Sequence, residues 1–283
     1  WEQRAAEFGA TFSPRDDMLG GDLSLTHRPR ESVSLWARVA RGFKAGGFNA
    51  SLVGVPGAED QLEFGPEYLW NYEVGTRLQS GDGRFAASLS VFYQDRDDLQ
   101  IKVPRQFVPG DPTTFLFATT NGESGHTAGV ELEGTWQPVE PLTLGAAFGL
   151  LATEIDRFSA RPELEGRELA HAPRYSFALN ATWRAGGGWF ARMDYTGKDA
   201  YAIDYCQAAD CNDPETDAYA VLDLRAGREW GAWSLEAWCR NVLDEDYAVR
   251  GFYFGNEPPA FEQTLYTRLG DPRHAGLTVK YRL

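Results

Sequence analysis

The 283-residue sequence has no run of about 18 or more apolar residues, which excludes a transmembrane helix. Its three cysteines are too few for a disulfide scaffold. A formal net charge of −14 argues against a nucleic-acid partner, which would require a basic patch. Four scattered histidines contain no pair at ligand spacing, and no G-x-S-x-G nucleophile elbow occurs. These absences predict no metal site, no cofactor, no catalytic residue and no enzyme activity.

What the sequence does contain is a repeated alternation of apolar and polar residues. In 274–283 the odd positions are mostly apolar and the even positions are polar, charged or glycine, as in a strand with one apolar face. This pattern predicts an all-β fold of about eleven antiparallel strands. They are expected at 18–27, 33–43, 69–79, 84–95, 114–121 continuing into 127–136, 142–155, 174–184, 189–201, 218–229, 233–242 and 274–283. The fifth strand is expected to be interrupted at 122–126.

The connections between these strands alternate strictly between short turns and long loops. This alternation, with one apolar face per strand, is typical of a transmembrane β-barrel. The short turns are then periplasmic, and the long loops 44–68, 96–112, 156–173, 202–217 and 243–273 are extracellular. Tryptophans near the short turns predict an aromatic girdle at that interface, formed by Trp36, Trp136, Trp183, Trp189, Trp230 and Trp233. A soluble β-sandwich is disfavoured, because charge lines one face of nearly every strand.

The odd number of strands suggests a partial barrel. Single-chain bacterial barrels have an even number of strands, and eleven would be half of a 22-stranded transporter with a plugged lumen. The first residue is Trp1, and no signal segment precedes it. The sequence is therefore expected to be either processed or a piece of a longer protein.

Several motifs in series carry a resemblance to a known family. They are RVARGFKAGGFN at 38–49, NYEVGTR at 71–77, GVELE at 129–133, RNVLDEDY at 240–247 and GLTVKY at 276–281. With these motifs the chain resembles the C-terminal half of the barrel of a TonB-dependent outer-membrane receptor, from about Phe12 onward. It departs at Leu283, where the family usually has an aromatic residue.

The resemblance implies one domain, 1–283, from which the N-terminal strands and the plug are missing. It implies the outer membrane of a Gram-negative bacterium and active uptake of a siderophore-like or other scarce ligand. The implied partners are outer-membrane lipid, a small-molecule ligand such as an iron chelate, and the TonB–ExbB–ExbD energy complex. That complex would be reached through a TonB box in the missing N-terminal region. A passive porin-like channel is the alternative, and a plug encoded upstream would distinguish the two.

Individual ligand-binding residues are not predicted, only the long loops. For the aromatic and cationic candidates within them, packing of the loops against each other is the alternative role. These candidates are Phe107, Phe115, Phe117, Arg161, Tyr201, Tyr205, Tyr253, Phe254 and Tyr266. Cys206 and Cys211 lie in one loop, where an oxidising exterior favours a disulfide over two free thiols. Acidic residues in the same loop favour a solvated surface over a calcium site. Asn241 and Asp244 are expected to tie a strand end through side-chain hydrogen bonds.

Overall fold

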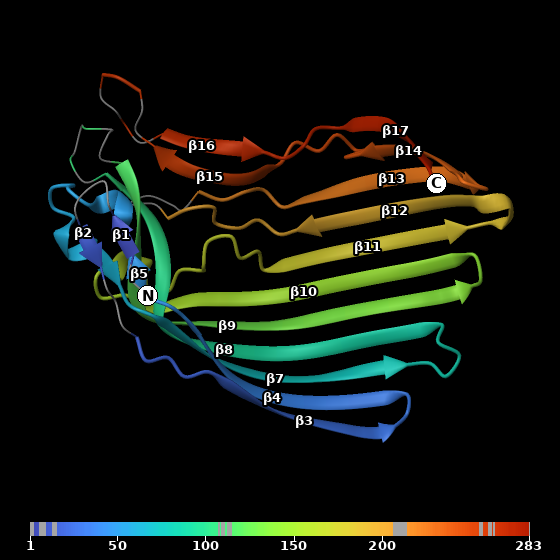
Figure 1. Cartoon of the computed structure of the whole chain (residues 1–283), viewed down its shortest axis with the longest axis horizontal. Coiled ribbons are helices and arrows are strands. Elements are labelled where there is room, and N and C mark those ends of the chain that lie inside the picture. Colours follow the sequence, from blue (N-terminus) through green and yellow to red (C-terminus); the bar gives the residue numbers. More distant parts are fainter. Residues whose placement is uncertain are drawn as a thin grey trace.

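The computed structural model describes residues 3–5, 10–12, 16–106, 108, 111, 115–205, 214–254, 257–259, 262 and 264–282. Eleven strands form one antiparallel sheet, in which almost every strand pairs with the next along the chain (Figure 1). From one edge to the other, they are β3 (Gly21–Arg30), β4 (Val33–Lys44), β7 (Glu67–Gln79), β8 (Phe85–Gln106), β9 (Phe115–Val139), β10 (Leu142–Arg157), β11 (Tyr175–Arg184), β12 (Trp189–Lys198), β13 (Tyr219–Trp230), β14 (Trp233–Arg240) and β17 (His274–Tyr281). The predicted all-β fold and its eleven strands are confirmed, and the sheet is open rather than closed into a barrel.

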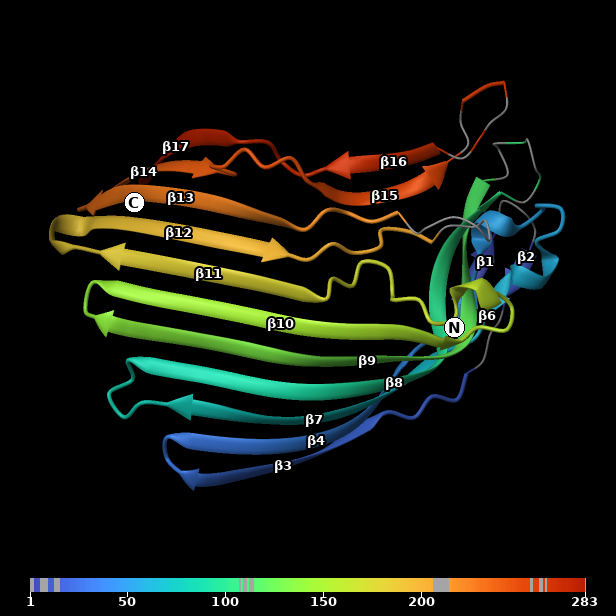
Figure 2. The ribbon, with the colours of Figure 1, turned by 180° about the vertical axis from the view of Figure 1, so that it is seen from behind.

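The smaller elements lie mainly in the long connections. Pairs of strands are β1 (Gln3–Ala5) with β2 (Ala10–Phe12), β5 (Gly47–Phe48) with β6 (Glu63–Phe64), and β15 (Ala248–Phe254) with β16 (Thr264–Leu269). Short 3₁₀ helices are η1 (Ala50–Leu52), η2 (Glu59–Gln61), η4 (Pro162–Leu164) and η5 (Gly186–Gly188). Figures 1 and 2 show the tight turns of the sheet at one end and the longer connections at the other. We call these the short-turn end and the long-loop end.

The strand register places the apolar residues of neighbouring strands opposite one another. Between β10 and β11, Leu144 lies opposite Ala181 and Phe148 opposite Phe177, whereas Thr143 lies opposite Thr182. The same separation continues to the edge, where the apolar positions of β14 lie opposite those of β17. We call the apolar face of the sheet the outward face and the polar face the inward face. A shift of one residue would exchange the two faces, so the alternation fixes the register.

The outward face is not covered by any other described part of the chain. Large hydrophobic side chains in the middle of the sheet remain exposed, including Leu132 at 47% and Leu150 at 46%. Buried hydrophobic residues occur instead at the long-loop end, in two clusters around Phe158 and Leu52. No helix among the described residues is long and apolar enough to span a membrane. A folded sheet that leaves one whole face apolar requires an apolar environment for that face.

Two of the predicted loops contain long stretches of strand. β8 continues to Gln106 and β9 begins at Phe115, so most of 96–112 belongs to a long hairpin. β9 also runs without a break through 122–126, where an interruption was expected. The irregularity lies in the partner strand, as a bulge between Ile155 and Arg157 of β10. Loop 243–273 likewise contains the β15–β16 hairpin.

Five of the six predicted girdle tryptophans lie on the outward face near the short-turn end. Trp136 lies opposite Phe85, Trp183 opposite Leu142, and Trp230 opposite Trp233; Trp189 shares their face. The prediction is wrong for Trp36, which lies opposite Gly75 on the inward face. Its indole N–H donates a hydrogen bond to Oε1 of Glu73 at 2.9 Å. Position 36 has the parity of the polar residues of its strand, so the alternation outweighs the preference of tryptophan for interfaces.

Candidate ligand-binding site

The long-loop end gathers the segments that the sequence predicts to bind ligand (Figure 1). Loop 44–68 carries η1, η2 and the β5–β6 pair, and 156–173 carries η4. Loop 202–217 is described at its two ends, where Ala202 forms a β-bridge with Glu215. Cys206 and Cys211 lie outside the described residues, so their disulfide stays a prediction.

Two of the aromatic candidates are buried and hold the loops together. Tyr201 and Tyr205 are 6% and 4% exposed. The Tyr201 hydroxyl donates to the carbonyl of Val249 at 3.2 Å. The Tyr205 hydroxyl accepts the backbone N–H of Ala170 at 2.8 Å and donates to the carbonyl of Glu168 at 3.3 Å. Both rings therefore pack segments that are distant in sequence, which is the alternative role left open for them.

The remaining candidates divide between side chains that the structure describes and those that it does not. Phe107 lies outside the described residues, as do the side chains of Phe115, Tyr253 and Phe254. Arg161 forms an ion pair with Glu163 in its own loop.

Phe117 and Tyr266 belong to a cluster that joins two hairpins. The Phe117 ring of β9 meets Phe252 of β15 edge to face, with centroids 6.0 Å apart, and Phe252 lies 6.4 Å from Tyr266. The Lys102 ammonium lies 5.1 Å from the centre of the Phe117 ring. We call Lys102, Phe117, Phe252 and Tyr266 the hairpin cluster. It presents aromatic rings and a cation together where the β8–β9 and β15–β16 hairpins meet.

A second cluster lies on the inward face at the long-loop end, where Lys198 of β12 pairs with Tyr219 of β13. The Lys198 ammonium lies 5.3 Å from the ring centre of Tyr201 and 5.6 Å from that of Tyr219. The Tyr219 ring in turn stacks on Tyr247, with centroids 4.3 Å apart. We call Lys198, Tyr201, Tyr219 and Tyr247 the tyrosine cluster. Sequence analysis selected only Tyr201 of these four, although the inward parity of Lys198 and Tyr219 was readable.

A neutral histidine and the cations Lys198 and Arg250 lie near the tyrosine cluster. His171 lies beside it, with its ring centroid 6.0 Å from that of Tyr201. Burial, with help from the nearby Arg250 and Lys198 charges, holds the pKa of His171 below its ordinary value. Burial also raises the pKa of the Tyr201 hydroxyl, so this group stays a neutral hydrogen-bond donor. Lys198 with the half-buried rings of Tyr219 and Tyr247 suits an anionic or aromatic ligand. The buried Tyr201 ring supports them from behind the loops.

Asn241 joins the long-loop end of β14 to the following loop through side-chain hydrogen bonds, as the sequence predicts. Its side-chain amide donates to the carbonyls of Glu245 at 2.9 Å and Asp271 at 3.1 Å, and its Oδ1 accepts the Glu245 N–H at 2.9 Å. Asp244 pairs with Arg273 at 2.9 Å. Asn241 is 2% exposed and has a φ of 48°, a conformation that asparagine tolerates better than most residues. These bonds fix the base of the segment that carries the β15–β16 hairpin.

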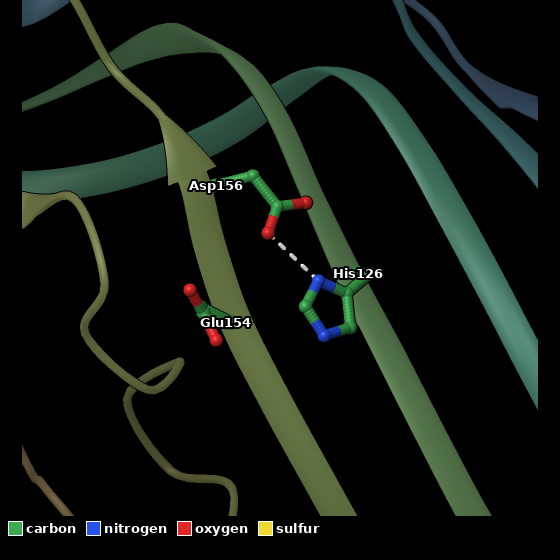
Figure 3. Close-up of side chains that lie close together, drawn as sticks. All are labelled: His126, Glu154 and Asp156. Carbon is green, nitrogen blue, oxygen red and sulfur yellow. Dashed lines mark hydrogen bonds and ion pairs between the residues drawn. The ribbon is translucent and has the colours of Figure 1, made fainter.

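The structure also brings together a set of metal-ligating side chains where none was predicted. His126 of β9 lies directly opposite Glu154 of β10, and Asp156 follows two residues later on the same strand (Figure 3). They lie on the outward face, away from both aromatic clusters. The residues are 28 to 30 positions apart, so inspection of local spacing misses them. Folding the 127–136 and 142–155 segments about their short turn would have aligned them.

Comparison with known proteins agrees with this architecture. Residues 2–242 match the family model described as TonB dependent receptor-like, beta-barrel. This chain belongs to the TonB-dependent receptor family. The family match agrees with the expected location in the outer membrane of a Gram-negative bacterium, in a family of transport receptors.

Curated relatives of this TonB-dependent receptor chain are similar over most of its length. The pesticin receptor of Yersinia pestis is 26% identical over 258 residues, covering 89% of this chain and 35% of the relative. The metal-pseudopaline receptor CntO of Pseudomonas aeruginosa is 25% identical over 266 residues, covering 92% of this chain and 33% of the relative. The chain thus spans about a third of the length of these curated relatives.

Solved structures of uptake and siderophore receptors share the fold. The ferric yersiniabactin uptake receptor FyuA of Yersinia pestis superposes with a TM-score of 0.75 at 22% identity, covering 97% of this chain and 39% of that chain. The siderophore receptor PiuA of Acinetobacter baumannii gives a TM-score of 0.67 at 16% identity, covering 92% and 35%. The open sheet therefore corresponds to part of the barrel wall of such receptors.

Proposed function

We propose that this chain forms part of the wall and the ligand-capturing loops of a receptor for energised uptake of a siderophore-like metal chelate. The observation that carries the proposal is the division of one sheet into an exposed apolar face and a polar face, in a chain of this family. The apolar face contacts outer-membrane lipid, and the polar face lines the lumen. Transport receptors need no catalytic group, so we propose that the chain is not an enzyme and binds no nucleic acid.

The orientation in the membrane follows from the two ends of the sheet. We assign the short turns to the periplasm and the loops 44–68, 96–112, 156–173, 202–217 and 243–273 to the cell exterior. The outward tryptophans mark the short-turn end as one membrane interface, and outer-membrane barrels have short turns on the periplasmic side and longer loops outside the cell. The Cys206–Cys211 disulfide, which an oxidising exterior permits, would stiffen one of these loops.

The complete receptor would contain more than this chain. The edge strands β3 and β17 each have one unpaired side within the described sheet. We propose that strands encoded upstream pair with both edges to complete a barrel of about 22 strands around a plug. That plug region would contact the TonB–ExbB–ExbD complex. This part of the proposal is tested by sequencing the DNA upstream of the Trp1 codon, which should encode these strands, a plug and a TonB box.

The ligand class rests on chemistry at the loop end and on the relatives. The hairpin and tyrosine clusters combine rings with the cations Lys102 and Lys198. Such groups suit chelates that carry carboxylate, phenolate or aromatic groups. The similar proteins include a ferric yersiniabactin uptake receptor and a metal-pseudopaline receptor, whose ligands are metal chelates. A passive porin-like channel remains the alternative, and no relative named above is a porin.

An uptake assay with the full-length receptor separates the two functions. The receptor is expressed in an iron-starved Gram-negative host without its own chelate receptors, with and without a functional TonB protein. The probes are radiolabelled ferric yersiniabactin and ferric citrate. Accumulation of one chelate, lost when TonB is deleted, supports the proposal. Uptake independent of TonB would favour the passive channel, and failure to bind or accumulate either chelate would contradict the assigned ligand class.

A further inference from the structure

The outward face changes character abruptly near the long-loop end. On β10, outward positions are apolar from Leu142 to Ala152 and then become Glu154 and Asp156. Ten residue steps of about 3.3 Å, tilted by about 40°, span about 25 Å, which matches the apolar band of outer-membrane barrels. His126 lies opposite Glu154 on one side and opposite Asp95 on the other. On the proposed orientation, these residues therefore lie just outside the apolar band, at the level of the lipid headgroups.

Three of these side chains converge. Nδ1 of His126 lies 2.7 Å from Oδ1 of Asp156, and one ligand atom from each of His126, Glu154 and Asp156 lies within 4.8 Å of the others. Figure 3 shows Glu154 and Asp156 on the strand beside His126, with the Asp156 carboxylate directed at the imidazole. The Tyr93 ring stacks against His126, with centroids 5.8 Å apart and planes inclined by 24°. Paired strands fix the backbones of His126 and Glu154, Asp156 lies in the bulge of β10 between Ile155 and Arg157, and the Tyr93 ring supports the imidazole.

We propose that His126, Glu154 and Asp156 form a binding site for a divalent transition-metal ion such as Zn²⁺ on the outward face of the wall. An imidazole nitrogen with two carboxylate oxygens suits zinc and its neighbours, whereas Ca²⁺ and Mg²⁺ prefer oxygen ligands alone. Two carboxylates also neutralise the charge of the ion.

The donor geometry needs only a small adjustment to hold an ion. A tetrahedral ion with ligands at about 2.1 Å keeps the donor atoms about 3.4 Å apart. The His126 Nδ1 and Asp156 Oδ1 atoms, which are 2.7 Å apart, would have to separate slightly. Rotation about the side-chain bonds of the exposed Glu154 would bring its carboxylate toward them. Three protein ligands leave one position open to solvent. The site lies outside the lumen, so it is separate from the proposed route of the transported chelate.

The rival explanation is an ordinary hydrogen-bonded ion pair of His126 and Asp156 beside an unrelated glutamate. The two explanations differ in what removal of Glu154 does. An ion pair does not involve Glu154, whereas a metal site loses one of its three ligands. A carboxylate on the same face that is not one of the three donors should have no effect on metal binding if the site is specific. Asp97 of β8 is exposed on that face but is not one of the three donors.

Metal titration of the full-length receptor, purified in detergent micelles, tests the site. Zn²⁺ binding is followed by calorimetry, and Co²⁺ is used as a visible-absorbing substitute. We expect one ion to be lost, or its affinity to fall at least about tenfold, in each of His126→Ala, Glu154→Gln and Asp156→Asn. Asp97→Asn and His27→Ala, which remove an acid and an exposed histidine elsewhere, should leave binding unchanged.

Specific outcomes would overturn the proposal. Wild-type receptor that binds no Zn²⁺, or that binds it equally well after Glu154→Gln, excludes a three-ligand site. An equal loss in Asp97→Asn would show general attraction to acidic charge instead of coordination. The heat-dependent gel mobility of each variant reports whether its barrel is folded. Chelate uptake is not part of the readout, so failure of this site would leave the proposed transport function standing.

Discussion

The two faces of the sheet obey opposite rules although they belong to the same strands. On β8, the outward side chains of Leu89 and Val91 are 39% and 46% exposed, and the inward side chains of Ser88 and Ser90 are small and polar. In a water-soluble sheet the apolar face would be the better buried of the two. Here the buried hydrophobic residues, among those that the structure describes, lie at the long-loop end where the loops fold together. The contrast shows that the environment of each face, and not a shared hydrophobic core, decides the sequence of the wall.

A charged residue in the middle of the outward face should have the largest effect. Leu89→Arg places a guanidinium near the centre of the apolar band and should destabilise the receptor by about 2–4 kcal/mol. Ser90→Arg, on the inward face next to it, should change stability by less than half as much. Chemical unfolding of the full-length receptor in phospholipid vesicles measures both. Equal losses for the two variants would break the distinction between the faces.

On the inward face, side-chain packing should contribute most to stability where an aromatic ring lies over a glycine. A Cβ at Gly75 would overlap the Trp36 indole, so Gly75→Ala must displace the ring and its hydrogen bond to Glu73. We expect a loss of about 1–3 kcal/mol in the same unfolding experiment. Gly42→Ala, in open space on the same pair of strands, is the control and should be close to neutral. A neutral Gly75→Ala would show that the inward face is loosely packed.

Ion pairs at the long-loop end should differ according to burial. Glu67, 6% exposed, accepts Arg96 Nη1 at 2.7 Å and the backbone N–H of Gln100 at 3.0 Å. Glu67→Gln should lower the protection of 96–100 against hydrogen exchange by about 1–2 kcal/mol. The exposed Arg174–Glu168 pair is the matched comparison, and Glu168→Gln should change local protection by less than about 1 kcal/mol. The reverse order would contradict this assignment of burial.

The smallest expected effect is a pH dependence of the tyrosine cluster. Because the pKa of His171 is lowered in the folded state, the fold favours the neutral ring, and protonation below about pH 6.5 weakens the local packing. Protection factors of the 169–173 amides should therefore fall between about pH 7 and 5. His171→Asn tolerates the positive φ of 61° and should remove this dependence. An unchanged profile in that variant would assign the effect to another group.

The sequence predicts the wall better than the loops, for a physical reason. Alternation with period two specifies both the strands and their register, so eleven strands and their faces follow from it. The same alternation places Trp36 on the inward face, where the structure has it. The continuity of β9 through 122–126 was missed because 122–125, Gly-Glu-Ser-Gly, has the composition of a turn. Loop packing was missed because contacts such as Phe117 with Phe252 join residues 135 positions apart, and no local pattern records them.

The most direct test of the account is a spin-label scan across one strand. Single cysteines are placed at each position from 86 to 93 of β8 in the full-length receptor, after replacement of Cys206, Cys211 and Cys239 by serine, and the receptor is reconstituted in lipid vesicles. Accessibility to lipid-dissolved oxygen should be high at 87, 89, 91 and 93 and low at 86, 88, 90 and 92. Accessibility that does not alternate, or that is highest at the even positions, would contradict a wall with one face toward lipid.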